Sequence, residues 1–152
     1  MFHNLAFATN NYETKSSILK VPNEITLSIL LKIDNNKNTF AHYSYGNKII
    51  YYHNAPVNWI RTHNFIPYFE SARDGIKKST QLKQLRFVNE ETALAVTGIL
   101  SSSLLFFWWL ISSDCYHLNN RELYSFKIDL NDQLIKKIEI ITNSLMDDFK
   151  KK

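Results

Sequence analysis

The chain has one cysteine, three glycines and three prolines among 152 residues. A single cysteine excludes an internal disulfide framework and fits a reducing compartment, so we expect a cytoplasmic protein. The glycines do not cluster anywhere, which excludes the glycine-rich loops that cradle dinucleotides and nucleoside triphosphates. We therefore expect no cofactor of this kind.

Residue groups that would support metal binding or nucleophilic catalysis are equally scarce. The histidines are scattered along the chain, and none stands three or four residues from another, so we expect no metal site. Cys115, with Asp114 and His117 close by, has the residue types of a nucleophile and its base. A lone cysteine is far more often a packing residue, so we expect no catalytic role for it.

A metal-dependent nuclease is a further hypothesis, since Glu70, Asp74 and Lys77 have the residue types of its acidic and lysine cluster. That chemistry places its carboxylates on rigid neighbouring strands. Residues 71–80 have no apolar period and are predicted to form an exposed loop. A solvated charged loop is therefore the simpler interpretation.

The chain does have the material for a core and an excess of positive charge. Hydrophobic residues make up 45% of the sequence and aromatic residues 14%, which is ample for one packed domain. The formal net charge of +4 favours an anionic partner such as nucleic acid or an acidic lipid surface. This charge alone does not choose between the two.

Residues 92–113 form an uncharged run that is long enough to span a bilayer. Thr97, Gly98 and the serines at 101–103 lie near its middle, where polar groups are least tolerated. Only residues 104–111 are continuously apolar. We interpret the run as a buried helix and keep a membrane-associated module as an alternative.

Alternation of apolar and polar residues predicts strands in the first half of the chain. Residues 24–33 alternate at period two and give the clearest predicted strand. Residues 40–45 and 48–53 are predicted to pair as a hairpin across Gly46 and Asn47. An antiparallel meander is the expected arrangement.

The second half is predicted to be mainly helical. After a further strand at residues 82–88, Asn89 is predicted to cap a central buried helix that ends near Ser113. Two glutamates in the first turn favour this start, because their charge complements the helix dipole. A short helix is predicted at residues 120–124.

The C-terminal residues predict an amphipathic helix that runs from about Asp132 towards Phe149. Its predicted apolar seam comprises Leu134, Ile138, Ile141, Leu145 and Phe149. We expect an α+β domain over residues 1–130, with an antiparallel or mixed sheet packed on the buried helix. Residues 131–152 are expected to form a helical segment that docks on a partner.

Basic, aromatic and amide residues are interleaved between residues 48 and 83. Lys and Arg neutralise phosphates, while Asn, Arg and His on loops can reach base edges in the major groove. We expect Arg61 and Asn54 to contact base edges and the lysines to contact phosphates. The tyrosines are more often half-buried strand residues than stacking platforms. The predicted DNA-facing residues are Tyr52, Asn54, Arg61, His63, Lys77, Lys78 and Lys83.

One part of the chain resembles a known family. The part with the strongest likeness is LRFVNEETALAVTGILSSSLLFFWWLISSDCYHLNNRELYSFKI. Its recurrent positions are residues 85–88, residues 100–109, Ser113 and Asp114, His117 and Leu118, Glu122 and Leu123, and Phe126. With the upstream YYHNAPVNWIR, this block resembles the C-terminal target-recognition region of adenine-specific DNA methyltransferases from bacterial restriction-modification systems.

The resemblance covers residues 49–130 and implies a role in reading a DNA target. Lys127 replaces a proline of the family pattern, and Ser101 replaces an asparagine. The chain has no Asn-Pro-Pro-Tyr tetrapeptide and no glycine-rich cofactor motif, so neither methyl transfer nor S-adenosylmethionine binding is carried over.

We therefore expect a non-catalytic DNA target-recognition fragment that binds double-stranded DNA. A methyltransferase core subunit is the protein partner that the resemblance implies. The alternatives are a protein-interaction or membrane-associated module and, less favoured, the metal-dependent nuclease.

Overall fold

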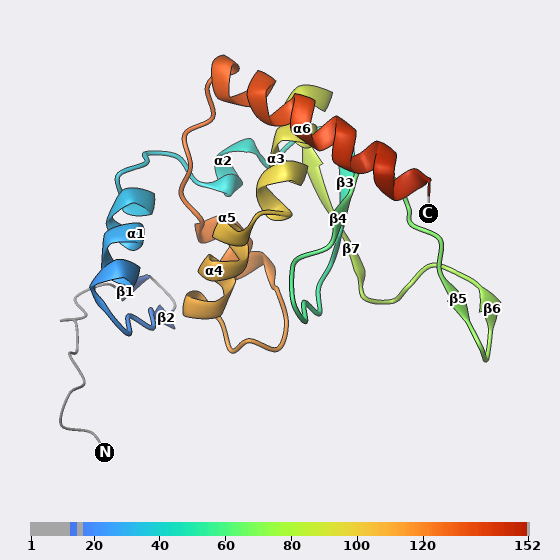
Figure 1. The fold of residues 1–152 in the computed structure, drawn as a ribbon, viewed down its shortest axis with the longest axis horizontal. Coiled ribbons are helices and arrows are strands. Elements are labelled where there is room, and N and C mark those ends of the chain that lie inside the picture. Colours follow the sequence, from blue (N-terminus) through green and yellow to red (C-terminus); the bar gives the residue numbers. More distant parts are fainter. Residues whose placement is uncertain (1–12, 15–16, 152) are drawn as a thin grey trace.

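Short strands and helices follow one another in blocks along the fold, which a computed structural model describes for residues 13–14 and 17–151 (Figure 1). In chain order the elements are β1 (Glu13–Thr14), β2 (Ser17–Ile18), α1 (Glu24–Asp34), α2 (Phe40–Tyr43), β3 (Lys48–His53), β4 (Thr62–His63), β5 (Glu70–Ser71), β6 (Gly75–Ile76), β7 (Leu82–Phe87), α3 (Glu90–Leu100), α4 (Ser103–Ser112), α5 (Asn120–Ser125) and α6 (Asp132–Lys150).

The main sheet has three antiparallel strands in the order β4-β3-β7. Ile50 pairs with Leu85 in its centre, and both side chains are buried together with Phe87. The sheet packs against α3, which follows β7 directly. The predicted α+β class is confirmed, with an antiparallel sheet against a buried helix and a long C-terminal helix.

Several predicted elements are confirmed because local signals and burial agree there. β7 covers most of residues 82–88, and α5 includes residues 120–124. Asn89 caps α3, since its side-chain oxygen accepts the N–H of Thr92 at 2.8 Å. The residues of α3 are almost all buried, as predicted for a central helix.

The strand predicted for residues 24–33 is wrong, because these residues form α1. Asn23 caps the helix by accepting the N–H of Thr26 at 2.9 Å. Thr26, Leu30 and Ile33 are the buried residues and stand at helical spacing. The sequence therefore has both the period-two pattern of a strand and the spacing of a helix. The Asn23 cap and the core contacts favour the helix.

The hairpin predicted across Gly46 and Asn47 is also wrong. Residues 40–43 form α2, and β3 pairs with β4 and β7 instead. The N–H of Phe40 donates to the carbonyl of Phe126 at 3.0 Å, and the two rings pack with centroids 5.3 Å apart. Phe40 thus finds its partner far away in the sequence, which a local pattern cannot reveal.

Further long-range bonds tie the α1–α2 connection to the segment between α5 and α6. The Asp129 carboxylate accepts the backbone N–H groups of Lys37 and Asn38 at 3.0 and 2.9 Å. Lys127 forms an ion pair with Asp34 at the end of α1. Asp129 is thereby held by backbone donors, and these lower the pKa of its carboxyl group.

Two serines divide the single helix predicted for residues 89–113 into α3 and α4. The Ser102 hydroxyl donates to the carbonyl of Ile99 at 2.6 Å and accepts the N–H of Leu105 at 3.4 Å, so it ends one helix and caps the next. The two axes are bent by 67°. Among the described residues, no single helix has both the length and the apolarity to cross a membrane. α3 and α4 meet the criteria of length and composition only when they are counted together as this bent pair.

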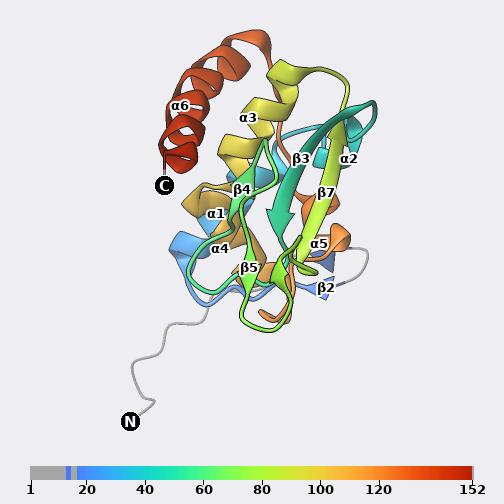
Figure 2. The same cartoon turned by 90° about the vertical axis from the view of Figure 1, so that its right-hand side faces the viewer.

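α6 lies along α3 in both views (Figures 1 and 2). Gly98 of α3 permits the close approach, because a Cβ there would collide with Thr142 Oγ1 and lie 2.8 Å from Ile138 Cγ2. The apolar seam differs from the predicted one, since Ile141 is 70% exposed whereas Thr142 and Met146 are buried. The small Thr142 fits against Gly98, and this contact sets the rotation of α6.

Candidate functional site

The excess positive charge of the chain lies in one stretch, residues 48–86. This stretch has seven Lys or Arg and two carboxylates, a net charge of +5, whereas the other residues together carry −1. The basic residues are Lys48, Arg61, Arg73, Lys77, Lys78, Lys83 and Arg86. This stretch runs from β3 to β7, so any anion-binding surface is to be sought around the sheet.

One face of the sheet is open. The strands stand in front of α3 in Figure 2, and on the face turned away from α3 the end of α6 reaches the β4 edge, where Phe149 packs on the His63 ring. Tyr51 and His53 of β3 lie on that face, because their strand neighbours Ile50 and Tyr52 are buried on the other. The Lys78 ammonium lies 5.3 Å from the centre of the Tyr51 ring. The open face thus combines aromatic and basic side chains.

A two-stranded hairpin, β5 with β6, projects from the body beside this face (Figure 1). Its ladder continues through a hydrogen bond from the Lys77 N–H to the Phe69 carbonyl at 3.0 Å. Gly75 has a φ of +68°, a conformation that favours glycine, and closes the turn. The Arg73 side chain at the tip is 93% exposed. The loop predicted for residues 71–80 is therefore exposed as expected, but part of it is an ordered hairpin.

A cavity of about 340 Å³ lies between the base of the hairpin and the open face. Its lining includes His53, Arg61 and His63, with Tyr68 from the segment that leads into the hairpin. Arg61 Nη2 lies 3.4 Å from His53 Nδ1. His63 Nδ1 is buried without a hydrogen-bond partner among the described residues. The cavity therefore gathers one cation and two titratable rings.

Both rings favour their neutral form in this environment. Burial lowers the pKa of His53, and the Arg61 guanidinium lowers it further. The pKa of His63 is lowered by burial, by Arg61 and by His53. The groups that oppose protonation are thus part of the cavity itself.

These pKa shifts predict that the folded chain loses stability on mild acidification. The unfolded state takes up protons as pH falls below the ordinary histidine pKa of about 6.5, whereas the folded state resists them, so stability is full above that pH and falls below it. The melting temperature should drop between pH 7.5 and pH 5.5, in buffer without polyvalent anions. A variant with both His53→Gln and His63→Gln should show a smaller drop, and an equal drop would contradict the assignment.

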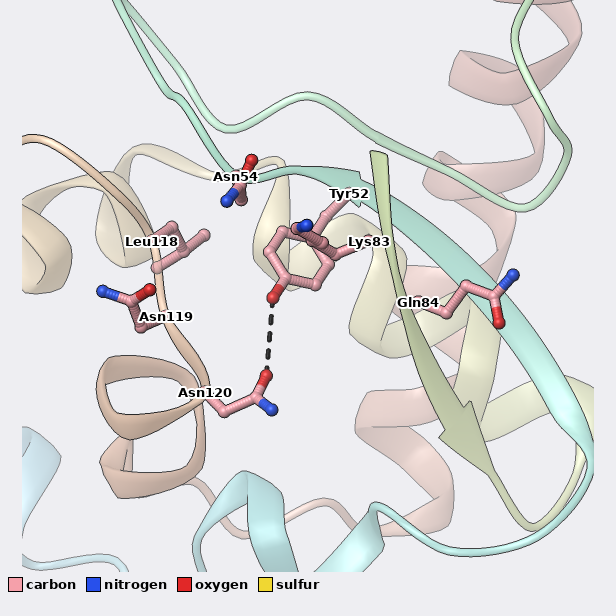
Figure 3. A pocket seen from close by; sticks show the side chains of 7 residues that line it. All are labelled: Tyr52, Asn54, Lys83, Gln84, Leu118, Asn119 and Asn120. Carbon is pink, nitrogen blue, oxygen red and sulfur yellow. Dashed lines mark hydrogen bonds between the residues drawn. The ribbon is translucent and has the colours of Figure 1, made fainter. Parts of the chain in front are cut away.

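A second cavity, of about 300 Å³, opens at the end of the sheet next to α5 (Figure 3). The Tyr52 hydroxyl donates to Asn120 Oδ1 at 3.4 Å inside it, while Gln84 points away from the centre. The Tyr52 ring is only 2% exposed, and burial raises the pKa of its hydroxyl to about 12, with smaller contributions from Tyr124 and Glu122. The lining residues are Tyr52, Asn54, Lys83, Gln84, Leu118, Asn119 and Asn120.

The predicted DNA-facing residues therefore fall into two groups. Arg61 and His63 line the first cavity, and Lys77 and Lys78 follow the hairpin. Tyr52, Asn54 and Lys83 line the second cavity. The buried ring of Tyr52 can offer only its hydroxyl to a ligand.

Two residues of the exposed face were missing from the prediction. Arg73 lies at the hairpin tip, and its place in an exposed segment, four residues before Lys77, was a usable signal. His53 meets Arg61 only through the pairing of β3 with the chain before β4, where the His53 N–H donates to the Arg61 carbonyl at 3.0 Å. That pairing has no local signature in the sequence.

The residues considered for catalysis have structural partners. The Asp114 carboxylate accepts the N–H of Tyr116 at 3.0 Å and pins the turn after α4. Glu70 accepts the Tyr68 hydroxyl at 2.6 Å, and Asp74 forms an ion pair with Lys77. Across the described part of the chain, no three His, Cys, Asp or Glu side chains are grouped so that they could hold a metal ion.

The geometry thus provides two polar cavities and an exposed hairpin with Arg73 at its tip, and no group of metal-ligating side chains is found in the part of the chain that the structure describes. Comparison of the chain with protein-family models, with curated proteins and with solved structures finds no match.

Proposed function

We propose that the chain binds double-stranded DNA as a non-catalytic target-recognition module, with the β5–β6 hairpin in the major groove. The observation that carries this proposal is the projecting hairpin, with an exposed Arg73 at its tip and Lys77 and Lys78 at its base, beside the open sheet face. A two-stranded ribbon fits the major groove, which is about 12 Å wide and about 8.5 Å deep. Residues 69–72 extend over roughly 13 Å at about 3.3 Å per residue, which is enough to reach the groove floor.

The side chains of the hairpin have distinct roles in this arrangement. Arg73 at the tip can present its guanidinium fork to the edge of a guanine. Lys77 and Lys78 stand further back, where they reach phosphates. Asp74 pairs with Lys77, and residues 69–78 carry three cations, Arg73, Lys77 and Lys78, against the two carboxylates of Glu70 and Asp74, a net charge of +1.

The sequence resemblance to methyltransferase target-recognition regions supports the same role. Under this proposal a methyltransferase core supplies catalysis in the reducing cytoplasm, because the present chain has neither the Asn-Pro-Pro-Tyr tetrapeptide nor a glycine-rich cofactor motif. The chain itself contributes DNA affinity and discrimination between sequences.

The test is the salt dependence of binding to duplex DNA. Changing Lys77 and Lys78 together to Ala should weaken binding to every duplex and flatten the slope of log K against log salt by about two units, since each phosphate contact contributes about 0.9. Arg73→Ala should instead reduce discrimination at one base pair, by about 1 to 3 kcal/mol. Fluorescence anisotropy over a range of salt concentrations measures both effects.

The matched control is the double change of Lys136 and Lys137 to Ala on the exposed side of α6, which removes the same charge away from the hairpin. Its slope should stay like that of the parent. Absence of duplex binding at low salt, or equal losses in the two double variants, would overturn the proposal.

A further inference from the structure

The cavity at the base of the hairpin is lined by nitrogen-bearing side chains, without a carboxylate from the described residues to neutralise them. Arg61, His53 and His63 converge there, and no carboxylate lines it among the described residues. Among its other polar lining residues, Ser79 and Gln81 can donate hydrogen bonds, while the Tyr68 hydroxyl already donates to Glu70. A pocket that offers a guanidinium and several neutral donors without a carboxylate is built for an anion.

The histidine geometry adds a second, independent observation. The 3.4 Å contact between Arg61 Nη2 and His53 Nδ1 is a hydrogen bond only when Nδ1 carries no proton, because the guanidinium has no acceptor. His63 Nδ1 is enclosed and lacks a partner among the described residues. Both rings therefore stand beside a fixed cation with unused capacity to take up a proton.

We infer that this cavity is a phosphate-binding site, and that binding of the phosphate is coupled to proton uptake by His53 and His63. A phosphate between the three side chains would place negative charge next to rings whose protonation is opposed by burial and by Arg61. Protonation turns each ring into a double donor, so the anion gains charge-assisted hydrogen bonds. The site then holds its ligand more tightly as pH falls.

The surrounding charges agree with this direction. From the strands, Arg61 and the two histidines face one another. From the hairpin side, Glu70 is the nearby carboxylate, and the Tyr68 hydroxyl already engages it. From α6, Phe149 packs on the His63 ring at 5.5 Å, and Lys150 lies over Phe65 but is paired with Asp147, so this pair adds no net charge.

This inference rests on the proposed function only for the source of the phosphate, which is a backbone phosphodiester of DNA gripped at the foot of the hairpin. It gives Arg61 a phosphate contact in place of the base contact expected from the sequence. Base discrimination is then left to Arg73 at the tip.

Inorganic sulfate is the probe for the site itself, because its charge is constant across the relevant range, whereas inorganic phosphate changes its charge near neutral pH. Proton NMR of the full chain should show the ring resonances of His53 and His63 titrating at higher pH when sulfate is added. The resonances of His42 and His117, which do not line the cavity, serve as internal controls and should not respond. This measurement needs no variant and no DNA.

Duplex DNA is the second probe. If one proton is taken up on binding, the affinity should rise about tenfold for each unit by which the pH falls. Binding at pH 6.0 should therefore exceed binding at pH 7.5 by about tenfold or more. Arg61→Gln should abolish most of this rise, whereas the Lys136→Gln control should keep it. Arg73→Ala should also keep the pH dependence, since it lies away from the cavity lining.

The outcomes separate the two proposals. Sulfate that leaves His53 and His63 unshifted, together with pH-independent DNA binding, overturns the phosphate site while the DNA-binding function stands. Shifted histidines without any duplex binding support the phosphate site and overturn the DNA-binding function. Shifted histidines with pH-dependent duplex binding, lost in Arg61→Gln, support both.

Discussion

Replacing Trp108 with serine should lower the free energy of unfolding by about 4 kcal/mol, because truncating a buried aromatic side chain costs about 3 to 5 kcal/mol. The side chain is 4% exposed and packs edge-on against the Phe126 ring at 5.8 Å. Its Nε1–H donates to the buried carbonyl of Glu122 at 2.8 Å, and the variant leaves this acceptor with only the longer bond from the Ser125 hydroxyl, at 3.2 Å. Urea denaturation followed by circular dichroism measures the loss.

Trp59→Ser is the matched control, since Trp59 is 58% exposed. Surface substitutions usually change stability by less than about 0.5 kcal/mol, and the same is expected here. A Trp108 variant that keeps its stability but loses DNA binding would place Trp108 in an interface and contradict its assignment to the core.

Changing Gly98 to valine should destabilise the chain by about 3 kcal/mol, at the upper end of the cost of overfilling a packed interior. The new side chain would meet Thr142 and Ile138 of α6, and Thr142 is buried. Gly98→Ala should cost less, because alanine regains about 1 kcal/mol of helix propensity. Chemical denaturation of both variants gives the two values.

Thr142→Ala provides the test of mechanism, because it removes the hydroxyl that the new Cβ would strike. Combined with Gly98→Ala, it should recover part of the lost stability, with a coupling free energy of about 1 kcal/mol in a double-mutant cycle. Strictly additive effects would show that α3 and α6 do not press on each other at this point.

The elements that were predicted correctly are those at which several local sequence signals indicate the same secondary structure. Asn89 precedes two glutamates and a buried stripe, so cap, dipole and burial all favour a helix start there. Residues 24–33 carry two periods at once, and the choice depends on which residues the core accepts. Phe40 is placed by Phe126, and no local pattern contains that contact.

The candidate site was predictable to the extent that it depends on exposure. The lysines of the hairpin lie in a segment without apolar period, which marks them as solvent-facing. Tyr52 could not be oriented in this way, because successive residues of a strand point to opposite faces and the register is set by partner strands. The meeting of Arg61 with His53 depends on the same pairing.

The bonds between the α1–α2 connection and Asp129 have a consequence for synthesis on the ribosome. The backbone N–H groups of Lys37 and Asn38 bind the carboxylate of Asp129, which is translated about 90 residues later. The ion pair of Asp34 likewise needs Lys127, which is also translated about 90 residues later. At about 5 to 20 residues per second, α1 emerges roughly 5 to 18 s before the segment that holds it. During that interval Leu30 and Ile33, buried in the finished fold, lack the C-terminal part of their core. The nascent chain therefore exposes the apolar residues of α1 to chaperones for several seconds, and these bonds can form only after residues 127–129 have been translated.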